Sequence, residues 1–170
     1  MISVYLPKYG HIWNIRENKD GGVRMSQVIN TRIEISAPAE KVWNVLTDFK
    51  RYPDWNPFVR TIKGELCEGS CLQVFLQPPE GKAMVFNPTI ISIKPGRQLV
   101  WMDRVLFPGL FDGEHRFVIK PLMNGHVTFC HSEAFNGLLS KLILKLVGKS
   151  TEAGFHAMNA ALKQRVEAGK

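Results

Sequence analysis

The segment from residue 113 to residue 139 predicts two antiparallel strands that carry ionisable groups into an apolar interior. In an extended strand every second side chain shares a face. On the second strand, one face carries Val127, Phe129, His131, Glu133 and Phe135. On the strand before it, one face carries His115, Phe117 and Ile119. Because these faces hold the large apolar groups they should be buried, and a buried carboxylate is costly without a partner.

The turn between the two strands predicts their register. Met123, Asn124 and Gly125 suit a three-residue hairpin loop in which Gly125 takes the left-handed backbone conformation. The ladder then places Ile119 opposite Phe129, Phe117 opposite His131, and His115 opposite Glu133. A slip of one residue would turn every buried side chain to the wrong face. The sequence therefore predicts a cross-strand His115–Glu133 pair with His131 diagonal to it, and an ordinary core in which these groups bond one another or water is the alternative.

Length and cysteine content limit the classes of protein to consider. The 170 residues fit a single domain with a substantial core. No apolar run is long enough to span a bilayer, and the N-terminus lacks the apolar core of a signal peptide, which predicts a cytoplasmic protein. Cys67, Cys71 and Cys130 are odd in number and form no C-x-x-C motif. We therefore expect no disulfide framework, no metal site and no cofactor.

The net charge of +7 is spread along the chain rather than gathered in one block. Lys141, Lys145 and Lys149 form a stripe at helical spacing. This stripe is either a solvated helix face, which is favoured, or a surface that attracts an anionic surface or an acidic ligand. Nucleic-acid binding would require a recognisable nucleic-acid-binding motif as well as positive charge, and the sequence contains no such motif. The expected partner is a small hydrophobic molecule, without integral membrane association.

The order of predicted elements indicates an α+β domain. Residues 1–24 differ in character from the rest of the chain and form an N-terminal extension, either disordered, which is favoured, or docked through Tyr5, Tyr9, Ile12 and Trp13. The domain, residues 25–170, opens with a strand at 28–36 and two short helices, the first beginning near Pro38. Further strands separated by short turns predict an antiparallel meander, with a bulge or an edge at Pro88. They cover residues 59–66, 71–77, 84–94, 98–106, 114–122 and 126–135.

A long C-terminal helix is predicted from about residue 138 to residue 166. Gly148 and Gly154 allow a bend in it. Its apolar stripe consists of Leu139, Leu142, Ile143, Leu146, Phe155, Met158, Leu162 and Val166. We expect a curved antiparallel sheet of six to seven strands that wraps around this helix and leaves a cavity between sheet and helix.

Short motifs along the chain match this element order. They are SAPAEKVW at residues 36–43, YPDWNPF at 52–58, PGLFDGEHRF at 108–117, FNGLL at 135–139 and GFHAMNAALK at 154–163. The chain resembles the SRPBCC superfamily, which includes START-type lipid-transfer domains, birch-pollen-allergen-like proteins and polyketide cyclase/dehydrase-like proteins. The resemblance covers about residues 26–168 and implies a helix-grip fold. It implies no single chemistry, because this superfamily places carriers, cyclases and hydroxylase subunits on one scaffold.

The favoured functional hypothesis is the binding of a small, largely hydrophobic ligand, such as a lipid or a polyketide-like or aromatic molecule. Ligand cavities are mostly apolar and contain a few polar groups that orient the ligand. The expected ligand-binding residues are Phe86, Leu99, Trp101, His115, Phe117, Phe129, His131, Glu133, Phe135, Phe155 and Met158.

Two alternative functions stay open at the level of the sequence. The first is a cyclase/dehydratase-like enzyme for a polyketide-like or aromatic substrate. In this hypothesis His115, oriented by Glu133, acts as the base, and His131 polarises a carbonyl group. The chain contains no nucleophile elbow, metal triad or phosphate loop in its support. The second alternative is a regulator that binds a protein partner.

Overall fold

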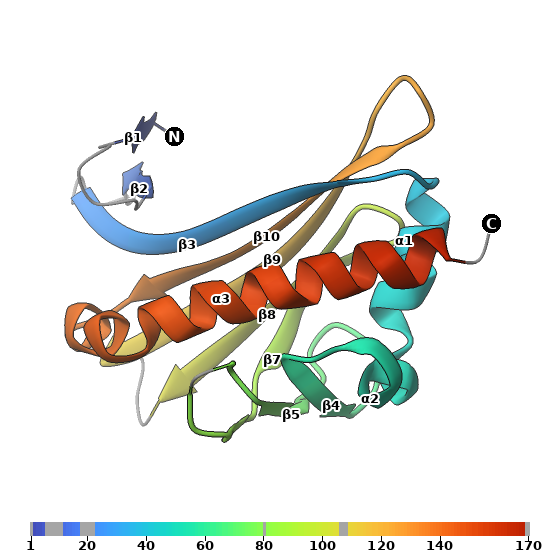
Figure 1. Ribbon diagram of the computed structural model, residues 1–170. Coiled ribbons are helices and arrows are strands. Elements are labelled where there is room, and N and C mark those ends of the chain that lie inside the picture. The colour runs from blue at the N-terminus through green and yellow to red at the C-terminus, as the bar shows by residue number, and fades with distance from the viewer. Residues whose placement is uncertain (1, 6–11, 18–22, 80, 106–108, 169–170) are drawn as a thin grey trace.

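One long C-terminal helix lies across the concave side of a curved antiparallel sheet (Figure 1). The computed structural model describes residues 2–5, 12–17, 23–79, 81–105 and 109–168. The helix is α3 (Ser140–Glu167). This arrangement is the predicted helix-grip fold of the α+β class, with two short helical segments following the first strand of the domain.

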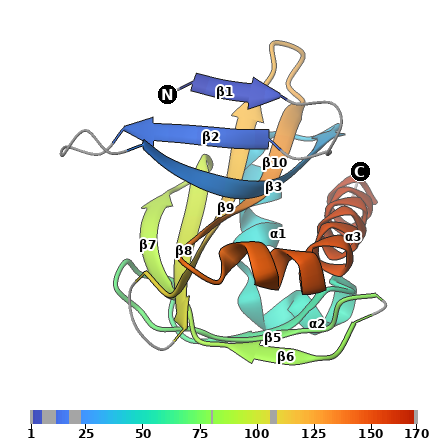
Figure 2. The same ribbon diagram turned by 90° about the vertical axis from the view of Figure 1, so that its left-hand side faces the viewer.

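The large sheet has seven strands within the described residues, in the order β1-β2-β3-β10-β9-β8-β7. All neighbours in it are antiparallel. Its strands are β1 (Ile2–Tyr5), β2 (Ile12–Glu17), β3 (Val23–Ile35), β7 (Thr89–Lys94), β8 (Gln98–Val105), β9 (Phe111–Pro121) and β10 (Val127–Asn136). Strands β1 and β2 extend the sheet beyond β3, so the described parts of the first 24 residues are paired strands (Figure 2). Tyr9 lies outside the described residues, and the separation of an extension from the domain stays a prediction.

The predicted meander divides between two sheets. Strands β4 (Val59–Lys63), β5 (Gln73–Leu76) and β6 (Met84–Phe86) form a separate three-stranded sheet. The single strand expected over residues 84–94 is therefore two strands, and Pro88 lies at the break between them. Because proline cannot donate to a ladder, a break at this position costs no hydrogen bond. An isolated bridge between Cys71 and Thr89 links the chain leading into β5 to the start of β7.

Two short helices and a turn of 3-10 helix connect β3 to β4. They are α1 (Ala39–Thr47), η1 (Phe49–Arg51) and α2 (Tyr52–Trp55). Tyr52 is fully buried, and its hydroxyl donates to the carbonyl oxygen of Leu46 at 2.6 Å. A second contact is made by Glu167 on α3, whose carboxylate accepts the backbone N–H of Ser36 at 2.6 Å. The first contact joins α2 to α1, and the second fixes the end of α3 beside α1 (Figure 1).

The register predicted for the β9–β10 hairpin is confirmed. Ile119 pairs with Phe129, Phe117 with His131, and His115 with Glu133. Gly125 in the connecting loop has the predicted left-handed backbone, with φ of +78°. Buried and less buried residues alternate along both strands, because one face packs against α3 and the core.

The apolar stripe of α3 is buried only along its C-terminal half. Phe155, Met158, Leu162 and Val166 are buried as predicted. Leu139, Leu142 and Leu146 are exposed, which corrects the expectation that the whole stripe faces the core. Within the described part of the chain, no helix has both the length and the apolar character required to cross a bilayer.

Gly154 permits close packing between α3 and the chain that leads into β4. The helix runs without interruption from Ser140 to Glu167, and its first turns lie at an angle to the rest, so it bends as expected from the sequence (Figure 2). A Cβ atom at Gly154 would overlap the ring of Phe58, which lies on the chain between α2 and β4. The absent side chain therefore lets the Phe58 ring contact the backbone of α3 directly.

Candidate functional site

Three rows of side chains cross the sheet beneath α3 because β8, β9, β10 and β3 pair in register. The central row contains Trp101, His115, Glu133 and Ile29. The rows on either side of it contain Leu99, Phe117, His131 and Thr31, and Asp103, Gly113, Phe135 and Gln27. Residues two apart on a strand share a face, so all three rows point to the same side of the sheet. The pairing thus brings His115, Glu133, His131 and Asp103 together from three strands.

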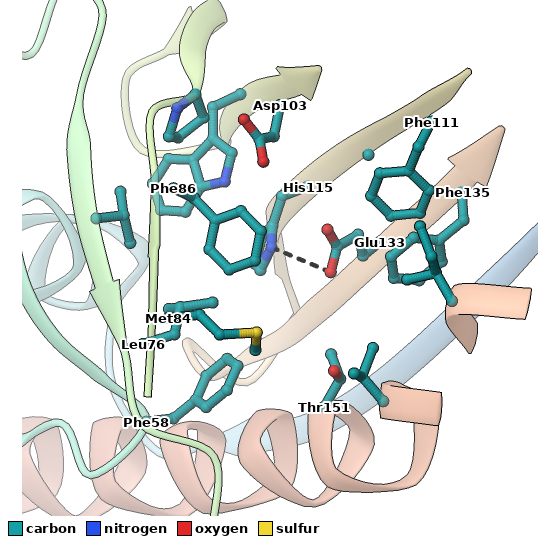
Figure 3. Close-up of a pocket in the computed structure, with 16 residues that line it drawn as sticks. Phe58, Leu76, Met84, Phe86, Asp103, Phe111, His115, Glu133, Phe135 and Thr151 are labelled. Carbon is teal, nitrogen blue, oxygen red and sulfur yellow. Dashed lines mark ion pairs between the residues drawn. The ribbon is translucent and has the colours of Figure 1, made fainter. Parts of the chain in front are cut away.

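A cavity of about 230 Å³ lies between this face, the three-stranded sheet and α3. Five of the residues expected from the sequence line it: Phe86, Trp101, His115, Glu133 and Phe135. Figure 3 shows His115 and Glu133 directed into it, with Phe58, Met84 and Phe86 across from them. Most of the lining is apolar, and the polar side chains are Asp103, His115, Glu133 and Thr151.

The other six residues expected at the site are packed in the core and do not line the cavity. They are Leu99, Phe117, Phe129, His131, Phe155 and Met158. His131 is covered by Phe155 of α3, whose ring stacks on the imidazole with centroids 3.7 Å apart and an interplanar angle of 15°. The aromatic ring therefore separates His131 from the cavity, and His131 contacts His115 instead.

The remaining lining residues were not predicted from the sequence. They are Phe58, Val74, Leu76, Met84, Pro88, Asp103, Phe111, Gly113, Ile143, Val147 and Thr151. Ile143, Val147 and Thr151 recur every four residues, which is the helical spacing that marks one face of α3. Val74 and Leu76 of β5 and Met84 of β6 could not be assigned, because their place opposite the hairpin follows from the division into two sheets.

A chain of hydrogen bonds runs from the core to the cavity and determines the tautomer of each histidine. Thr31 donates its hydroxyl hydrogen to the carbonyl oxygen of His131 at 3.1 Å, so its oxygen accepts from the Asn159 amide nitrogen at 2.8 Å. The Asn159 oxygen then faces Nδ1 of His131 at 3.0 Å, and Nδ1 must carry the hydrogen. Neutral His131 consequently presents a lone pair on Nε2, which lies 2.7 Å from Nε2 of His115.

This chain leaves a lone pair on the cavity side of His115. Because Nε2 of His115 donates to His131, its Nδ1 carries no hydrogen in the neutral ring. Nδ1 lies 3.7 Å from Oε2 of Glu133, which is beyond hydrogen-bond length. In the described part of the chain the Glu133 carboxyl has no hydrogen-bond partner, so both groups are available to a third molecule.

Burial favours the neutral form of every member of this cluster. It lowers the pKa of His115 to about 3. Burial, and secondly the neighbouring His115, hold the pKa of His131 well below its usual value, although the hydrogen bond to Asn159 opposes this shift. Burial, with a smaller contribution from the negative charge of Asp103, raises the pKa of Glu133 to about 8. At neutral pH a protonated carboxyl group therefore faces a neutral imidazole.

Gly113 provides the space that the Glu133 carboxyl occupies. A Cβ atom at Gly113 would lie 2.9 Å from Oε1 of Glu133. A glycine within a strand often marks a close approach of another group. This property of Gly113 could have identified it as a site residue from the sequence. In the described residues, no three His, Cys, Asp or Glu side chains are grouped to hold a metal ion.

The fold and this site agree with a match to a family of known proteins. The family is described as polyketide cyclase / dehydrase and lipid transport, and its model matches residues 26–167. The chain belongs to this family. None of the curated protein sequences compared with the chain is similar enough to match it.

Several solved structures share the fold. The di-domain ARO/CYC BexL from the BE-7585A biosynthetic pathway is 14% identical, with a TM-score of 0.67 over 84% of this chain, which spans only 50% of BexL. The Zhui aromatase/cyclase from Streptomyces sp. R1128 is 15% identical, with a TM-score of 0.64 over 85% of this chain and 98% of that one. A START superfamily protein from Mycobacterium smegmatis is 22% identical, with a TM-score of 0.62 over 84% of this chain and 99% of that one. At these identities the similarity establishes the fold alone.

Proposed function

We propose that this protein binds a small, largely hydrophobic molecule in the cavity between the two sheets and α3. The observation that carries the proposal is the mostly apolar cavity of about 230 Å³ with His115 and Glu133 on one wall. Its volume exceeds that of an engineered cavity of about 150 Å³ that binds benzene. A bicyclic aromatic molecule or a short acyl chain is therefore of suitable size.

The polar groups of the cavity favour a ligand with one neutral polar end. Protonated Glu133 offers a hydrogen-bond donor, and Nδ1 of His115 offers an acceptor 3.7 Å away. A hydroxyl or carbonyl oxygen of the ligand satisfies one or both without introducing charge. A carboxylate would be unfavourable at this position, because it would lose its hydration close to Asp103.

Native mass spectrometry of gently purified protein, followed by titration with 2-naphthol, tests the proposal. This probe has a bicyclic apolar body and one hydroxyl group. Val147→Trp places a large side chain into the cavity from α3 and should abolish binding, since Val147 lines the cavity. Leu146→Trp makes the same change one residue earlier at an exposed position and should bind like the wild type.

The comparison of 2-naphthol with 2-methylnaphthalene tests the role of the polar groups. The probe without a hydroxyl group should bind more weakly by about 1 kcal/mol, the usual value of one neutral hydrogen bond. His115→Gln and Glu133→Gln should each reduce that difference. If Val147→Trp binds 2-naphthol as tightly as the wild type, the cavity is not the binding site and the proposal is rejected.

A second candidate function is proton transfer on a bound carbonyl compound. It is favoured by the neutral Glu133 carboxyl beside an imidazole whose hydrogen-bond chain leaves a lone pair on Nδ1. In such a reaction Nδ1 of His115 takes a proton from the carbon next to the carbonyl, while Glu133 gives its proton to the carbonyl oxygen. The product is the enol, and the reverse transfers restore the ketone.

Hydrogen–deuterium exchange of 2-tetralone in D₂O measures this activity directly. An enzyme should accelerate exchange at the carbon next to the carbonyl, and His115→Gln should reduce the rate by about 10²–10⁴ while binding survives. The rate should fall above about pH 8, where Glu133 loses its proton. Binding of 2-tetralone without accelerated exchange would reject the catalytic candidate and leave the binding function.

A further inference from the structure

The first turns of α3 and the two residues before them expose an unusual concentration of leucine side chains. Leu138, Leu142 and Leu146 recur every four residues and are 87%, 57% and 73% exposed. With Leu139 they make up four of the eight large hydrophobic side chains that are exposed among the described residues. Figure 2 shows this end of α3 at the front of the molecule, away from β1 and β2. Single exposed apolar residues are ordinary, but a contiguous group commonly marks an interaction surface.

Lysines lie between these leucines. Lys141, Lys145 and Lys149 are all exposed, and each lies three or four residues from a leucine, so the two kinds of side chain are neighbours on the helix surface. Residues 137–151 contain no Asp or Glu. Positive charge in the first turn of a helix is unfavourable to the helix dipole, so Lys141 does not stabilise α3 through the dipole. The surface formed by residues 138–149 is thus both apolar and cationic.

The same turns of α3 also carry cavity-lining residues. Ile143 and Val147 line the cavity, one residue after Leu142 and Leu146 respectively. The helix therefore has an inner apolar face toward the cavity and an outer apolar face that no described residue covers. An outer face of this composition is distinct from a helix that is apolar only toward a core.

We propose that the outer face of residues 138–149 docks on the surface of an anionic lipid bilayer. Leucine and lysine side chains side by side on one helix suit the membrane interface, where leucines enter the acyl boundary and lysines remain at the charged headgroups. A symmetric pairing with a second copy is less suited, because it would bring the lysines of both copies together with no acid in the segment. Docking would place the cavity, through Ile143 and Val147, next to the lipid.

Co-flotation with vesicles tests this surface in the full chain. The protein should bind vesicles of phosphatidylcholine mixed with phosphatidylglycerol and should not bind vesicles of phosphatidylcholine alone. Binding should weaken as salt is added, because the headgroup attraction is screened. Each Lys→Gln change at Lys141, Lys145 or Lys149 should reduce the partition coefficient roughly fivefold.

The apolar contribution is measured separately. Leu142→Ser and Leu146→Ser should each weaken vesicle binding by on the order of tenfold, since each removes an apolar side chain from the interface. Ile91→Ser on β7 is the matched control, because Ile91 is an exposed apolar residue elsewhere on the molecule. It should leave binding unchanged. All of these positions are exposed, so the variants should fold, and circular dichroism verifies this.

Three outcomes would overturn the proposal. The first is that the wild type fails to bind anionic vesicles. The second is that the leucine variants bind as well as the wild type. The third is that the chain dimerises in solution through Leu142 and Leu146 without binding vesicles. The last outcome would assign this surface to a second copy. The proposal does not depend on the cavity ligand: Val147→Trp, which fills the cavity, should still bind vesicles.

Discussion

Single residues determine which proton positions are available in the cavity. Thr31 and Asn159 do not line it, yet they decide that His131 carries its hydrogen on Nδ1. His131 in turn decides that His115 donates through Nε2. Because each group has a fixed number of donors and acceptors, the arrangement at the cavity is set by residues in the core.

The raised pKa of Glu133 should make the folded state less stable as the pH rises. The pKa increases from 4.5 to about 8 on folding, so the folded protein holds a proton that the unfolded chain has released. This contribution is complete below about pH 4.5 and is lost as the pH rises to 8. Between pH 6.5 and 8 the loss is on the order of 2 kcal/mol. Urea unfolding across this range measures it.

Glu133→Gln isolates this effect. Glutamine keeps the shape of the protonated carboxyl group but does not titrate, so the free energy of unfolding should change less between pH 6.5 and 8 than in the wild type. The lowered pKa of His115 acts at lower pH, where stability should rise between about pH 3 and 6.5 in both proteins. Parallel pH profiles for the two proteins would contradict a raised pKa at Glu133.

Asn159→Leu should break the hydrogen-bond chain without opening a large cavity. It leaves the Nδ1–H group of buried His131 without a partner, which costs about 1–3 kcal/mol of unfolding free energy. Nitrogen NMR of the imidazole rings should show the Nδ1–H tautomer for His131 and the Nε2–H tautomer for His115 only in the wild type. Asn44→Leu, at an exposed position on α1, is the control and should change stability by less than about 0.5 kcal/mol. Unchanged tautomers in Asn159→Leu would contradict the assignment.

At the scale of elements, local patterns predicted the hairpin and failed where the pairing is distant. Alternation of apolar residues and the glycine loop were sufficient for the register of β9 and β10, because both signals lie within one hairpin. The division of residues 59–94 between two sheets depends on pairing with β8 and on the bridge between Cys71 and Thr89, which no local pattern encodes. For the same reason Val74, Leu76 and Met84 were not predicted, although Phe86 of β6 was.

The long helix gives a second example. The sequence predicted its apolar stripe from the helical spacing of the residues. That spacing is the same for a stripe that packs in the core and for one that lies on the surface. Leu142 and Leu146 belong to the exposed end, whereas Met158 and Leu162 face the sheet. Only the position of the sheet relative to the helix separates the two sets.

Gly154→Ala should destabilise the protein although alanine is the better helix former. The added methyl group would overlap the ring of buried Phe58, and overpacking of a core costs about 1–3 kcal/mol. The gain in helix propensity of about 1 kcal/mol offsets only part of this cost. Gly148→Ala is the matched control, because its methyl group would meet only the flexible end of Leu144, at 3.2 Å. Thermal unfolding in which Gly154→Ala is as stable as Gly148→Ala would contradict the packing role.

At the scale of the whole molecule, α3 joins three regions. Its C-terminal half completes the core, while its first three turns line the cavity with one face and present the exposed surface of residues 138–149 with the other. Any change in the position of the first turns would alter the cavity wall as well, because Ile143 and Val147 are on the same turns. Surface and cavity are therefore mechanically connected, even though each proposal is tested separately.

The last prediction concerns the first two strands. A chain that begins at Val23 should bind 2-naphthol with an affinity within about twofold of the full chain, because none of the described residues before Phe58 lines the cavity and the family match begins at residue 26. It should nevertheless aggregate at lower concentration, since loss of β2 leaves the backbone groups of β3 unpaired at the edge of the sheet. Calorimetric titration and light scattering of both chains measure the two effects. A truncated chain that stays soluble and folded but does not bind the probe would show that β1 and β2 support the cavity, and that residues 1–24 are not an extension to an independent domain.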